Sequence, residues 1–353
     1  MTIIGVMMKI FLVGGAVRDE LMGQDVTDRD FVVTGSDVST MLKLGYTQVG
    51  KDFPVFIHPE TGEEYALARQ ERKISLGHDG FQFDFSPETP LETDLMRRDL
   101  TINAIAKDDT GEYIDPYNGR GDINKKILRH VSSAFVEDPL RVLRVCRFKA
   151  KFPSFKIDDS TFEMMKSMIF SKDFSALSKH RNWQELSKTL QYQQPEHFFY
   201  CLTDLEFLPK SVIDHLTVLT FEKETSLIKF SCMLHHPDML SWVNMIFSPP
   251  NEYIFLASKF NKYKNIYNKI EAQELLNCFK DLRAFTNTKW IKLYLQCGHA
   301  LYGKDLDSLL LPLLEELTRV SAADFPHIDP GPELGEAIEQ RRLEIITRSI
   351  DAI

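Results

Sequence analysis

A short apolar segment that ends in two glycines constrains the fold of this chain most strongly. Residues 9–13 have the length and composition of a buried strand, the Gly14-Gly15 pair interrupts them, and an amphipathic segment from Val17 to Met22 follows. These residues predict a strand, a tight turn and a short helix. Glycines at such a turn let backbone amides approach an anion, and the helix N-terminus beside them favours negative charge, with Arg18 available as a cation.

Two aspartates follow this unit at short range. Asp28 and Asp30 lie two residues apart on a segment, 28–33, that is typical of a second strand, so the pleat places both carboxylates on one face roughly 7 Å apart. Such a pair can hold divalent metal, and magnesium prefers a few carboxylates together with phosphate oxygens. An isolated Asp-x-Asp pair is more often part of a turn or a helix cap, so the neighbouring motifs decide between these interpretations.

A third feature is a basic segment with helical spacing. One carboxylate and three guanidinium groups recur every three residues and therefore follow one side of a predicted helix: Asp138, Arg141, Arg144 and Arg147. Asp138 suits the N-cap and Pro139 the first helical position. The stretch from Arg120 to Lys151 holds nine basic residues against three acidic ones, although the formal net charge of the chain is −9. This local excess can face a polyphosphate or RNA, or it forms a solvated helix face.

Several sequence blocks, in a fixed order, resemble a known family. They are G-G-A-V-R-D-E-L-M-G followed by D-R-D-F-V-V, then R-R-D-L-T-I-N-A (97–104), I-D-P-Y-N-G (114–119) and E-D-P-L-R-V-L-R-V-C-R-F (137–148). Together they resemble the class II nucleotidyltransferase and poly(A) polymerase family, in the branch that contains the bacterial CCA-adding enzymes. The resemblance is strong over residues 8–150 and weak over residues 150–210.

The resemblance implies an α+β fold. We expect an N-terminal nucleotidyltransferase head with a small mixed β-sheet, followed by an all-helical neck, body and tail. Residues 1–137 would form the catalytic head, residues 138–210 the helical neck and body that select the nucleotide, and residues 211–353 the helical tail that docks tRNA.

The resemblance also implies an activity: template-independent addition of C-C-A to the 3′ end of tRNA from CTP and ATP. The tRNA 3′-hydroxyl would attack the α-phosphorus in line and pyrophosphate would leave, with Mg²⁺ as the cofactor. Carried over position by position, Asp28 and Asp30 become the metal-binding catalytic carboxylates. The nucleotide-binding positions become Gly15, Arg18, Arg98, Asp138, Arg141, Arg144 and Arg147.

Base selection is expected at the start of the predicted helix. Cytosine and adenine both present an amino donor beside a ring acceptor, whereas guanine and uracil present a carbonyl beside a ring N–H. Asp138 with Arg141 would accept the first pair and reject the second, which matches the protein template of the resembling family. The alternative is a capped helix with a surface ion pair. Residues 97–99 likewise fit a helix start capped by Asp99, which is compatible with Arg98 reaching a phosphate.

Two further segments bear on specificity. Residues 71–90 are polar and contain glycine without a clear period, so we expect a long mobile loop. Family members that add both C and A keep a loop here as a lever, and its presence through Phe81–Phe85 favours full C-C-A synthesis over CC-only addition. Residues 181–185 resemble a helical family element that is normally preceded by glutamate, where this chain has His180. We assign this segment a structural role.

Three rival functions remain open. A poly(A) polymerase shares the head, but such enzymes usually carry longer basic extensions and this chain is acidic overall. A CC-adding or A-adding specialist is the second rival. The third is a non-catalytic RNA-binding relic, against which the intact carboxylate pair and its arginines argue.

The tail resembles a degenerate His-Asp phosphohydrolase domain. Related proteobacterial enzymes mark this metal-dependent domain with a His-Asp pair, but here His236 stands in place of the aspartate and Asp238 is off register. Adjacent histidines on a helix would point about 100° apart and could not replace the missing carboxylate. We therefore expect no phosphatase or cyclic-nucleotide phosphodiesterase activity from residues 210–353.

Composition indicates the cellular compartment of the protein. The five cysteines are odd in number, widely spaced and mostly in apolar surroundings, which favours reduced core thiols over disulfides or zinc. No window approaches 18 consecutive apolar residues, and the first eight residues lack the features of a secretory signal. We expect a cytoplasmic enzyme without a membrane partner, and we favour a monomer.

Overall fold

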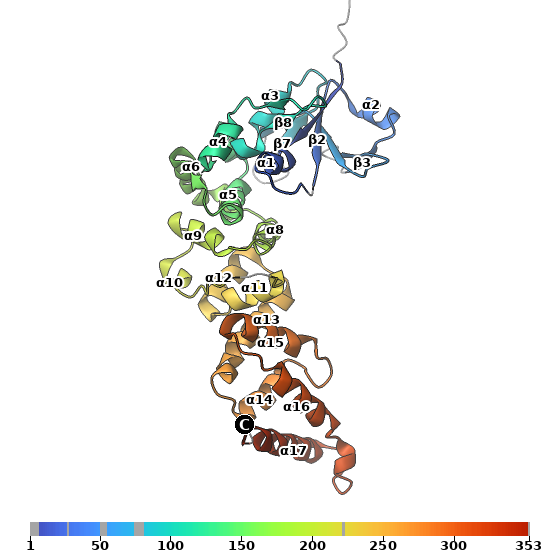
Figure 1. Ribbon diagram of the computed structural model, residues 1–353, viewed down its shortest axis with the longest axis vertical. Coiled ribbons are helices and arrows are strands. Elements are labelled where there is room, and N and C mark those ends of the chain that lie inside the picture. The colour runs from blue at the N-terminus through green and yellow to red at the C-terminus, as the bar shows by residue number, and fades with distance from the viewer. Residues whose placement is uncertain (1–6, 27, 50–54, 74–80, 221–222, 352–353) are drawn as a thin grey trace, which may run out of the picture. The chain divides into compact units, whose positions relative to one another are not determined.

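The computed structural model describes residues 7–26, 28–49, 55–73, 81–220 and 223–351, with backbone only between 70 and 84 (Figure 1). The chain forms two compact units, Met1–Glu185 with His197–Phe207 and Leu186–Glu196 with Leu208–Ile353. All described strands belong to the first unit, whereas the second is helical, so the predicted α+β class is confirmed. The three-part division of the chain stays a prediction.

The elements of the first unit alternate between short strands and short helices. The strands are β1 (Lys9–Val13), β2 (Asp30–Thr34), β3 (Thr47–Val49), β4 (Val55–Ile57), β5 (Glu64–Leu67), β6 (Gln70–Lys73), β7 (Phe81–Asp84), β8 (Ala106–Lys107), β9 (Tyr113–Ile114), β10 (Ile127–Leu128) and β11 (Lys156–Ile157). The helices are α1 (Gly15–Leu21), α2 (Val38–Lys43), α3 (Leu91–Met96), α4 (Gly119–Lys125), α5 (Leu140–Lys151), α6 (Asp159–Ile169) and α7 (Lys172–Ser175). Helices α8 (Lys179–Thr189) and α9 (Glu196–Asp204) cross the unit boundary, and 3-10 turns occur at η2 (Thr101–Asn103) and η3 (Ser133–Glu137).

A seven-stranded mixed sheet organises the first unit. Its strand order is β3-β4-β5-β2-β1-β8-β9, with β2 and β5 parallel and the other neighbours antiparallel. Because side chains alternate along a strand, Phe11 and Val13 join one apolar cluster with Leu95 of α3, whereas Ile10 packs with Met41 of α2 in another. Both faces of the sheet are therefore covered, and the polar residues are left to the strand ends.

The register of the two central strands positions the first two motifs. Val13, the last residue of β1, lies opposite Asp30, the first residue of β2. The strand therefore begins at Asp30, so the prediction that it starts at Asp28 is wrong by two residues. Gly14 then turns the chain with φ of 73°, and a Cβ atom there would lie 2.8 Å from Arg98 Nη1. This register brings the glycine turn next to the carboxylates.

The predicted long loop at 71–90 is wrong at residues 71–73 and 81–84, which form strands, whereas residues 85–90 contain only turn and irregular structure. β6 pairs with β7 in an antiparallel ladder, with Glu71 opposite Phe83 and Lys73 opposite Phe81. Alternation of phenylalanine with polar residues over 81–85 is the strand signal, and the polar composition of the segment obscured it. Residues 74–80 lie outside the described part, so the expected mobility there stays a prediction.

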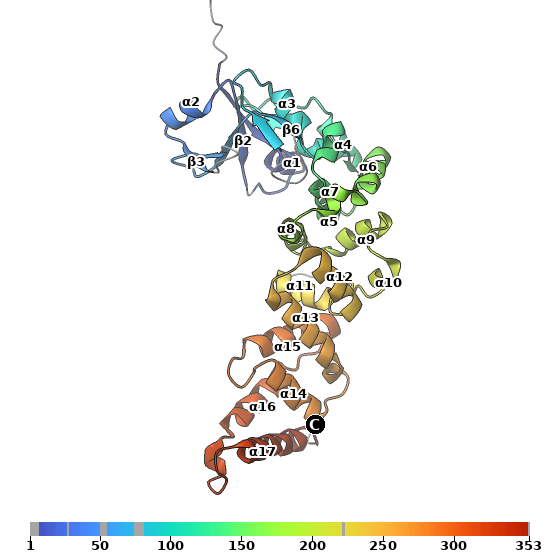
Figure 2. The same cartoon turned by 180° about the vertical axis from the view of Figure 1, so that it is seen from behind.

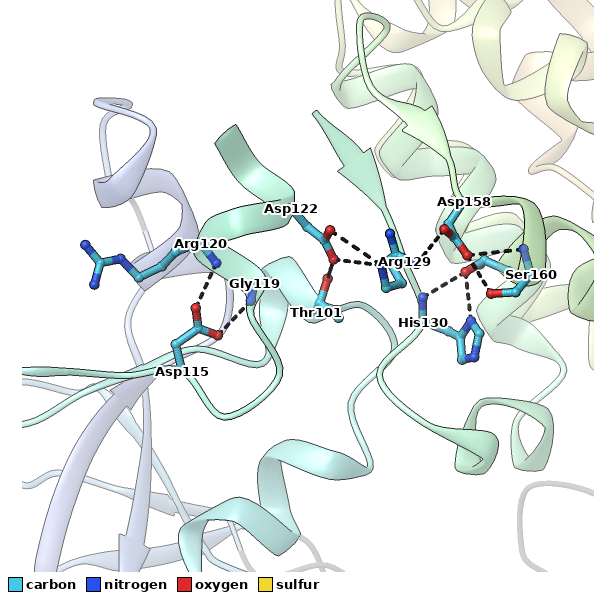
Figure 3. A network of polar contacts seen from close by, with 10 residues as sticks. Thr101, Asp115, Gly119, Arg120, Asp122, Arg129, His130, Asp158 and Ser160 are labelled. Carbon is cyan, nitrogen blue, oxygen red and sulfur yellow. Dashed lines mark hydrogen bonds and ion pairs between the residues drawn. The ribbon is translucent and has the colours of Figure 1, made fainter. Parts of the chain in front are cut away.

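A network of polar contacts fixes the segment that precedes α5 and the start of α6 (Figure 3). Thr101 Oγ1 donates to Asp122 at 2.7 Å, and Arg129 Nε donates to the same carboxylate at 3.2 Å. Arg129 Nη1 reaches Asp158 Oδ2 at 2.5 Å, and Asp158 in turn accepts from the backbone N–H of Ser160 to begin α6. Arg129 lies between the two carboxylates and thus connects η2 and α4 to the start of α6.

The second unit is built from helices alone in the described residues. They are α10 (Lys210–Ile213), α11 (Ser226–Met233), α12 (Pro237–Phe247), α13 (Asn251–Tyr263), α14 (Ala272–Asp281), α15 (Lys289–Tyr302), α16 (Asp307–Arg319) and α17 (Pro332–Asp351), with 3-10 turns η4 (Lys264–Tyr267) and η5 (Ala322–Asp324). α13 packs against α11 and α15, and α17 packs against α14 and α16 (Figure 2). Gly298 of α15 permits this packing, because a Cβ atom there would overlap the ring of Tyr267.

The predicted state of the cysteines is confirmed: Cys146, Cys201, Cys232, Cys278 and Cys297 are all free and buried. Among the residues that the structure describes, none of the helices combines the length and the apolar character needed to cross a membrane.

Candidate active site

One cleft in the first unit collects all the residues predicted to act on a nucleotide. Its volume is about 620 Å³, and its walls come from α1, the segments beside β2 and α3, α5 and the start of α8. The predicted residues that line it are Gly15, Arg18, Asp28, Asp30, Arg98, Asp138, Arg141, Arg144 and Arg147. Residues separated by more than a hundred positions in the sequence therefore share one cavity.

Asp28 and Asp30 are the two acidic groups of the cleft that stay open to solvent. Both side chains are exposed, and within the described part of the chain neither carboxylate accepts a hydrogen bond or forms an ion pair. Although Asp30 is exposed, desolvation by the surrounding protein raises the pKa of its carboxyl, Arg98 opposes this rise and Asp28 adds to it. When both carboxyl groups are ionised, their unpaired negative charges attract a cation.

The remaining walls carry an excess of positive charge. Nine cationic side chains and five carboxylates line the cleft, a formal excess of four. Three guanidinium groups gather around the ring of buried Phe148, at 5.3 Å for Arg18, 5.9 Å for Arg144 and 4.4 Å for Arg147. Such cation–π contacts are worth about 0.5–2 kcal/mol each and help like charges to share one wall. The wall is suited to a polyanion.

Arg18 is fixed on several sides in the floor of the cleft. Its Nη1 donates to Asn103 Oδ1 at 2.5 Å and its Nε donates to Asp19 Oδ1 at 2.8 Å, while the side chain is almost fully buried. Lys151, at the end of α5, reaches the other oxygen of Asp19 at 3.0 Å. Burial lowers the pKa of Lys151, and Arg18 lowers it further. Asp19 therefore holds two cations of the cleft in place.

Arg98 and Arg144 are held by buried carboxylates. Arg144 Nη2 lies 2.6 Å from Asp99 Oδ2. Burial raises the pKa of Asp99, but the charge and hydrogen bond of Arg144, the hydrogen bond from Asn103 and the charge of Arg141 together outweigh burial, so the pKa is lowered. Arg98 Nη2 lies 3.4 Å from Asp94 Oδ2. Within the described residues, the buried Nε of Arg98 has no hydrogen-bond partner. Arg98 lines the cleft, and a buried donor without an acceptor is rare in folded proteins.

The predicted base-reading pair has a different arrangement from the one expected. α5 begins at Leu140 with Pro139 as its N-cap, so the prediction of an N-cap at Asp138 is wrong by one residue. Asp138 still accepts from the backbone N–H of Leu140 at 3.1 Å, and its carboxylate pairs with Arg181 at 3.0 Å. Arg141 donates to the carbonyls of Ala134 at 2.7 Å and Arg97 at 2.5 Å. Both side chains line the cleft, and these contacts join Asp138 to Leu140 and Arg181, and Arg141 to two backbone carbonyls.

The sequence reasoning missed several lining residues. Arg181 was given a purely structural role, yet it lines the cleft beside Asp138. Lys151 follows Arg147 by four positions, so extension of the helical spacing would have found it. Asp99 was expected to cap a helix start, which is wrong because the next helical turn, η2, has Leu100 as its N-cap; Asp99 instead binds Arg144. Arg97 also lines the cleft and belongs to the R-R-D-L-T-I-N-A block but was not singled out, whereas Arg69 carries no signal in the local sequence.

The tail histidines differ from the expected geometry. α11 ends at Met233 and α12 begins at Pro237, so His235 and His236 lie between two helices and the expectation that both sit on one helix is wrong. His235 is buried, with its Nδ1 2.8 Å from the Cys232 carbonyl, and its ring packs edge-on against Phe260. The absence of hydrolase activity stays a prediction.

Comparisons with known proteins agree with these motifs. A family model described as the poly A polymerase head domain matches residues 10–129. The CCA-adding enzyme of Coxiella burnetii (strain RSA 493 / Nine Mile phase I) is 38% identical over 358 residues, which cover 96% of this chain and 95% of that enzyme.

Solved structures share the fold over nearly the whole chain. The Bacillus stearothermophilus CCA-adding enzyme in complex with CTP matches with a TM-score of 0.66 at 20% identity, over 97% of this chain and 89% of that chain. The Thermotoga maritima CCA-adding enzyme complexed with tRNA matches with a TM-score of 0.61 at 18% identity, over 98% and 91%. At these identities the structures bear on the fold, whereas the near-complete sequence match bears on the family. The chain therefore belongs to the CCA-adding enzymes, class II nucleotidyltransferases with a poly(A) polymerase head domain.

Proposed function

We propose that this tRNA nucleotidyltransferase adds all three nucleotides of C-C-A to the 3′ end of tRNA, using CTP and ATP and releasing pyrophosphate. One observation carries the proposal: two open carboxylates share a cleft with an arginine-rich wall of net positive charge. Nucleotidyl transfer needs these two elements, because a polyanionic substrate must be held while a hydroxyl is brought to its α-phosphorus.

The donor set of the cleft suits a hard divalent cation. Asp28 and Asp30 offer carboxylate oxygens that no described side chain occupies, and magnesium prefers oxygen ligands, with substrate phosphates completing its shell. These two residues would hold Mg²⁺. When bound, the ion would supply positive charge beside the phosphates and the attacking oxygen.

The arginines and Lys151 would hold the triphosphate. Arg18 and Arg144 are oriented by Asp19 and Asp99 before a nucleotide arrives, so little rotamer entropy is lost when they meet a phosphate. The open Nε of Arg98 would gain the acceptor that it lacks. Gly14 and Gly15 keep side chains away from the start of α1, so its backbone amides stay accessible to an anion.

Base selection would use Asp138 and Arg141. The Asp138 carboxylate can accept from the amino group of cytosine or adenine, and an Arg141 N–H can donate to the adjacent ring nitrogen. Arg181 orients the Asp138 carboxylate through the 3.0 Å ion pair, in which both side chains are about three quarters covered. An incoming base would share this carboxylate with Arg181, so the pair sets the angle at which the base is read.

We assign one role to each of three parts of the chain. Residues 1–137 would catalyse, residues 138–210 would select the nucleotide, and the helical residues 211–353 would bind tRNA. The Thermotoga maritima relative complexed with tRNA, which shares the fold of the whole chain, supports this assignment. Five free buried thiols agree with a reducing compartment such as the cytoplasm.

A nucleotide-by-nucleotide assay tests the proposal. tRNA transcripts ending before C-C-A, after C and after C-C are incubated with the purified chain, Mg²⁺ and one nucleotide at a time, and the product ends are sequenced. We expect CTP to extend the first two transcripts up to C-C, and ATP to extend only the third by one residue. Runs of A would indicate a poly(A) polymerase, a stop at C-C a CC-adding enzyme, A alone an A-adding enzyme, and no product a binding protein; each outcome contradicts the proposal.

A further inference from the structure

Two histidines and an aspartate converge in the second unit, away from the residues used so far. His215 follows α10, His236 precedes α12, and Asp238 lies in the first turn of α12. One ligand atom of each residue lies within 4.8 Å of the others. We propose that these three side chains bind a late first-row transition-metal dication, zinc being the reference case, and that the ion ties the turn after α10 to the start of α12.

The distances are close to those of a metal shell. His215 Nε2 lies 3.5 Å from Asp238 Oδ2, and His236 Nδ1 lies 3.9 Å from the same oxygen. Ligands at about 2.05 Å from a tetrahedral zinc are about 3.3 Å apart, so the carboxylate needs to close these gaps by only a few tenths of an ångström. The Asp238 oxygen is therefore within side-chain adjustment of both histidines, and the histidine nitrogens lie within 4.8 Å of each other.

The two imidazoles must rotate before both can bind one ion, and His236 Nδ1 must also release the backbone N–H of Asp238, from which it accepts at 3.4 Å as the N-cap of α12. Their rings are stacked with centroids 3.5 Å apart and an interplanar angle of 11°, so their lone pairs lie in parallel planes. Rotation about the side-chain bonds would aim both at one ion. Both side chains are about one third exposed, so solvent-filled space is available for this rotation.

The backbone around the cluster is held in place. Thr217 N–H donates to the Met233 carbonyl at 3.1 Å, which fixes the segment after His215 beside the end of α11. The His236 carbonyl accepts from Leu240 at 2.8 Å and so begins α12, against which α10 packs. The three ligands thus come from element ends whose positions are already set, which lowers the ordering cost of binding.

The donor set selects the class of metal. Two imidazole nitrogens and one carboxylate suit zinc, nickel, cobalt or copper, whereas magnesium prefers oxygen ligands throughout. Lys264 and the N-terminus of α12, which carries roughly half a positive charge, oppose a cation here. The full negative charge of Asp238 and the bonds from the two nitrogen ligands offset this repulsion. The proposal concerns binding, and it does not depend on the function assigned to the cleft.

Cobalt spectroscopy tests the site in the full-length chain. The protein carries Asp28→Ala and Asp30→Ala, so that the cleft carboxylates do not contribute, and is titrated with Co²⁺ and then with Zn²⁺. We expect visible d–d absorption that saturates near one equivalent and disappears when zinc displaces cobalt. In the same background His215→Ala and Asp238→Asn should each weaken binding by tenfold or more. His327→Ala, which removes an exposed histidine elsewhere in the unit, should leave binding unchanged.

The outcomes separate the site from an ordinary surface ion pair. Absence of cobalt absorption overturns the proposal, as does binding that is unchanged in both ligand variants or lost in His327→Ala. Asp238→Asn preserves the shape of the side chain, so it decides the question if circular dichroism shows that His215→Ala is misfolded.

Discussion

Replacement of Arg147 by alanine should destabilise the first unit severely. Arg147 Nε donates to Glu185 Oε2 at 2.5 Å, and the two side chains are only 9% and 4% exposed. Removal of one partner leaves the other charge buried, a cost of about 3–5 kcal/mol. The lost cation–π contact with Phe148, at 4.4 Å, adds about 1 kcal/mol.

This cost converts into a measurable shift of the melting temperature. For a unit of about 200 residues, 1 kcal/mol corresponds to roughly 2–4 °C, so a cost of about 4–6 kcal/mol should lower the first thermal transition of Arg147→Ala by roughly 8–24 °C. Lys125→Ala, an exposed change at the end of α4, is the control and should shift the transition by little. The double variant Arg147→Met with Glu185→Leu removes both charges and should melt near the wild-type temperature.

Nucleotide addition then separates stability from binding. If Arg147 contacts the nucleotide as proposed, the stable double variant still adds CTP poorly, with a raised KM. Equal melting temperatures of Arg147→Ala and the Lys125→Ala control would refute a buried ion pair that stabilises the unit. A double variant as unstable as Arg147→Ala would refute it as well.

Four further changes test other parts of the chain. Asp28→Ala or Asp30→Ala should reduce addition by several orders of magnitude while filter binding of tRNA persists, and substantial activity of the double variant would remove the metal-site assignment. Asp138→Ala should relax discrimination against GTP and UTP by about 1–3 kcal/mol in kcat/KM, and unchanged rejection would exclude a templating role. The lowered pKa of Asp99 stabilises the fold above about pH 4, the ordinary aspartate value, and this stability is lost as pH falls toward the folded pKa; Asp99→Asn should flatten acid melting curves in that range. The chain should not hydrolyse p-nitrophenyl phosphate with nickel or magnesium, and hydrolysis abolished by His235→Ala would contradict this.

The local elements around the cleft that the sequence predicted correctly depend on short-range geometry. The strand–glycine–helix unit spans residues 9–21, and the periodic arginines of α5 lie within one helix, so local spacing alone places them.

The parts that failed depend on contacts between distant residues. Arg144 meets Asp99 across 45 positions and Arg181 meets Asp138 across 43, and no local pattern reports such pairs. The strand order of the sheet is similarly non-local. β2 pairs in parallel with β5, and the two strands between them in the chain, β3 and β4, lie on the far side of β5 at the edge of the sheet. The family resemblance indicated that Arg144 and Asp138 bind the nucleotide, but it did not indicate that Asp99 and Arg181 are their partners.

The pattern of those pairs explains why Asp28 and Asp30 are suited to a metal. Five arginines of the cleft have carboxylate partners of their own: Arg18 with Asp19, Arg98 with Asp94, Arg144 with Asp99, Arg147 with Glu185 and Arg181 with Asp138. An arginine that paired with Asp28 or Asp30 would neutralise the charge and block the oxygens that a cation needs. Because other acids orient the guanidinium groups, the cleft keeps donors for phosphate and oxygen ligands for metal at the same time. Charge reversal of Asp19 or Asp99 should therefore damage the metal site indirectly, by releasing an arginine toward Asp30.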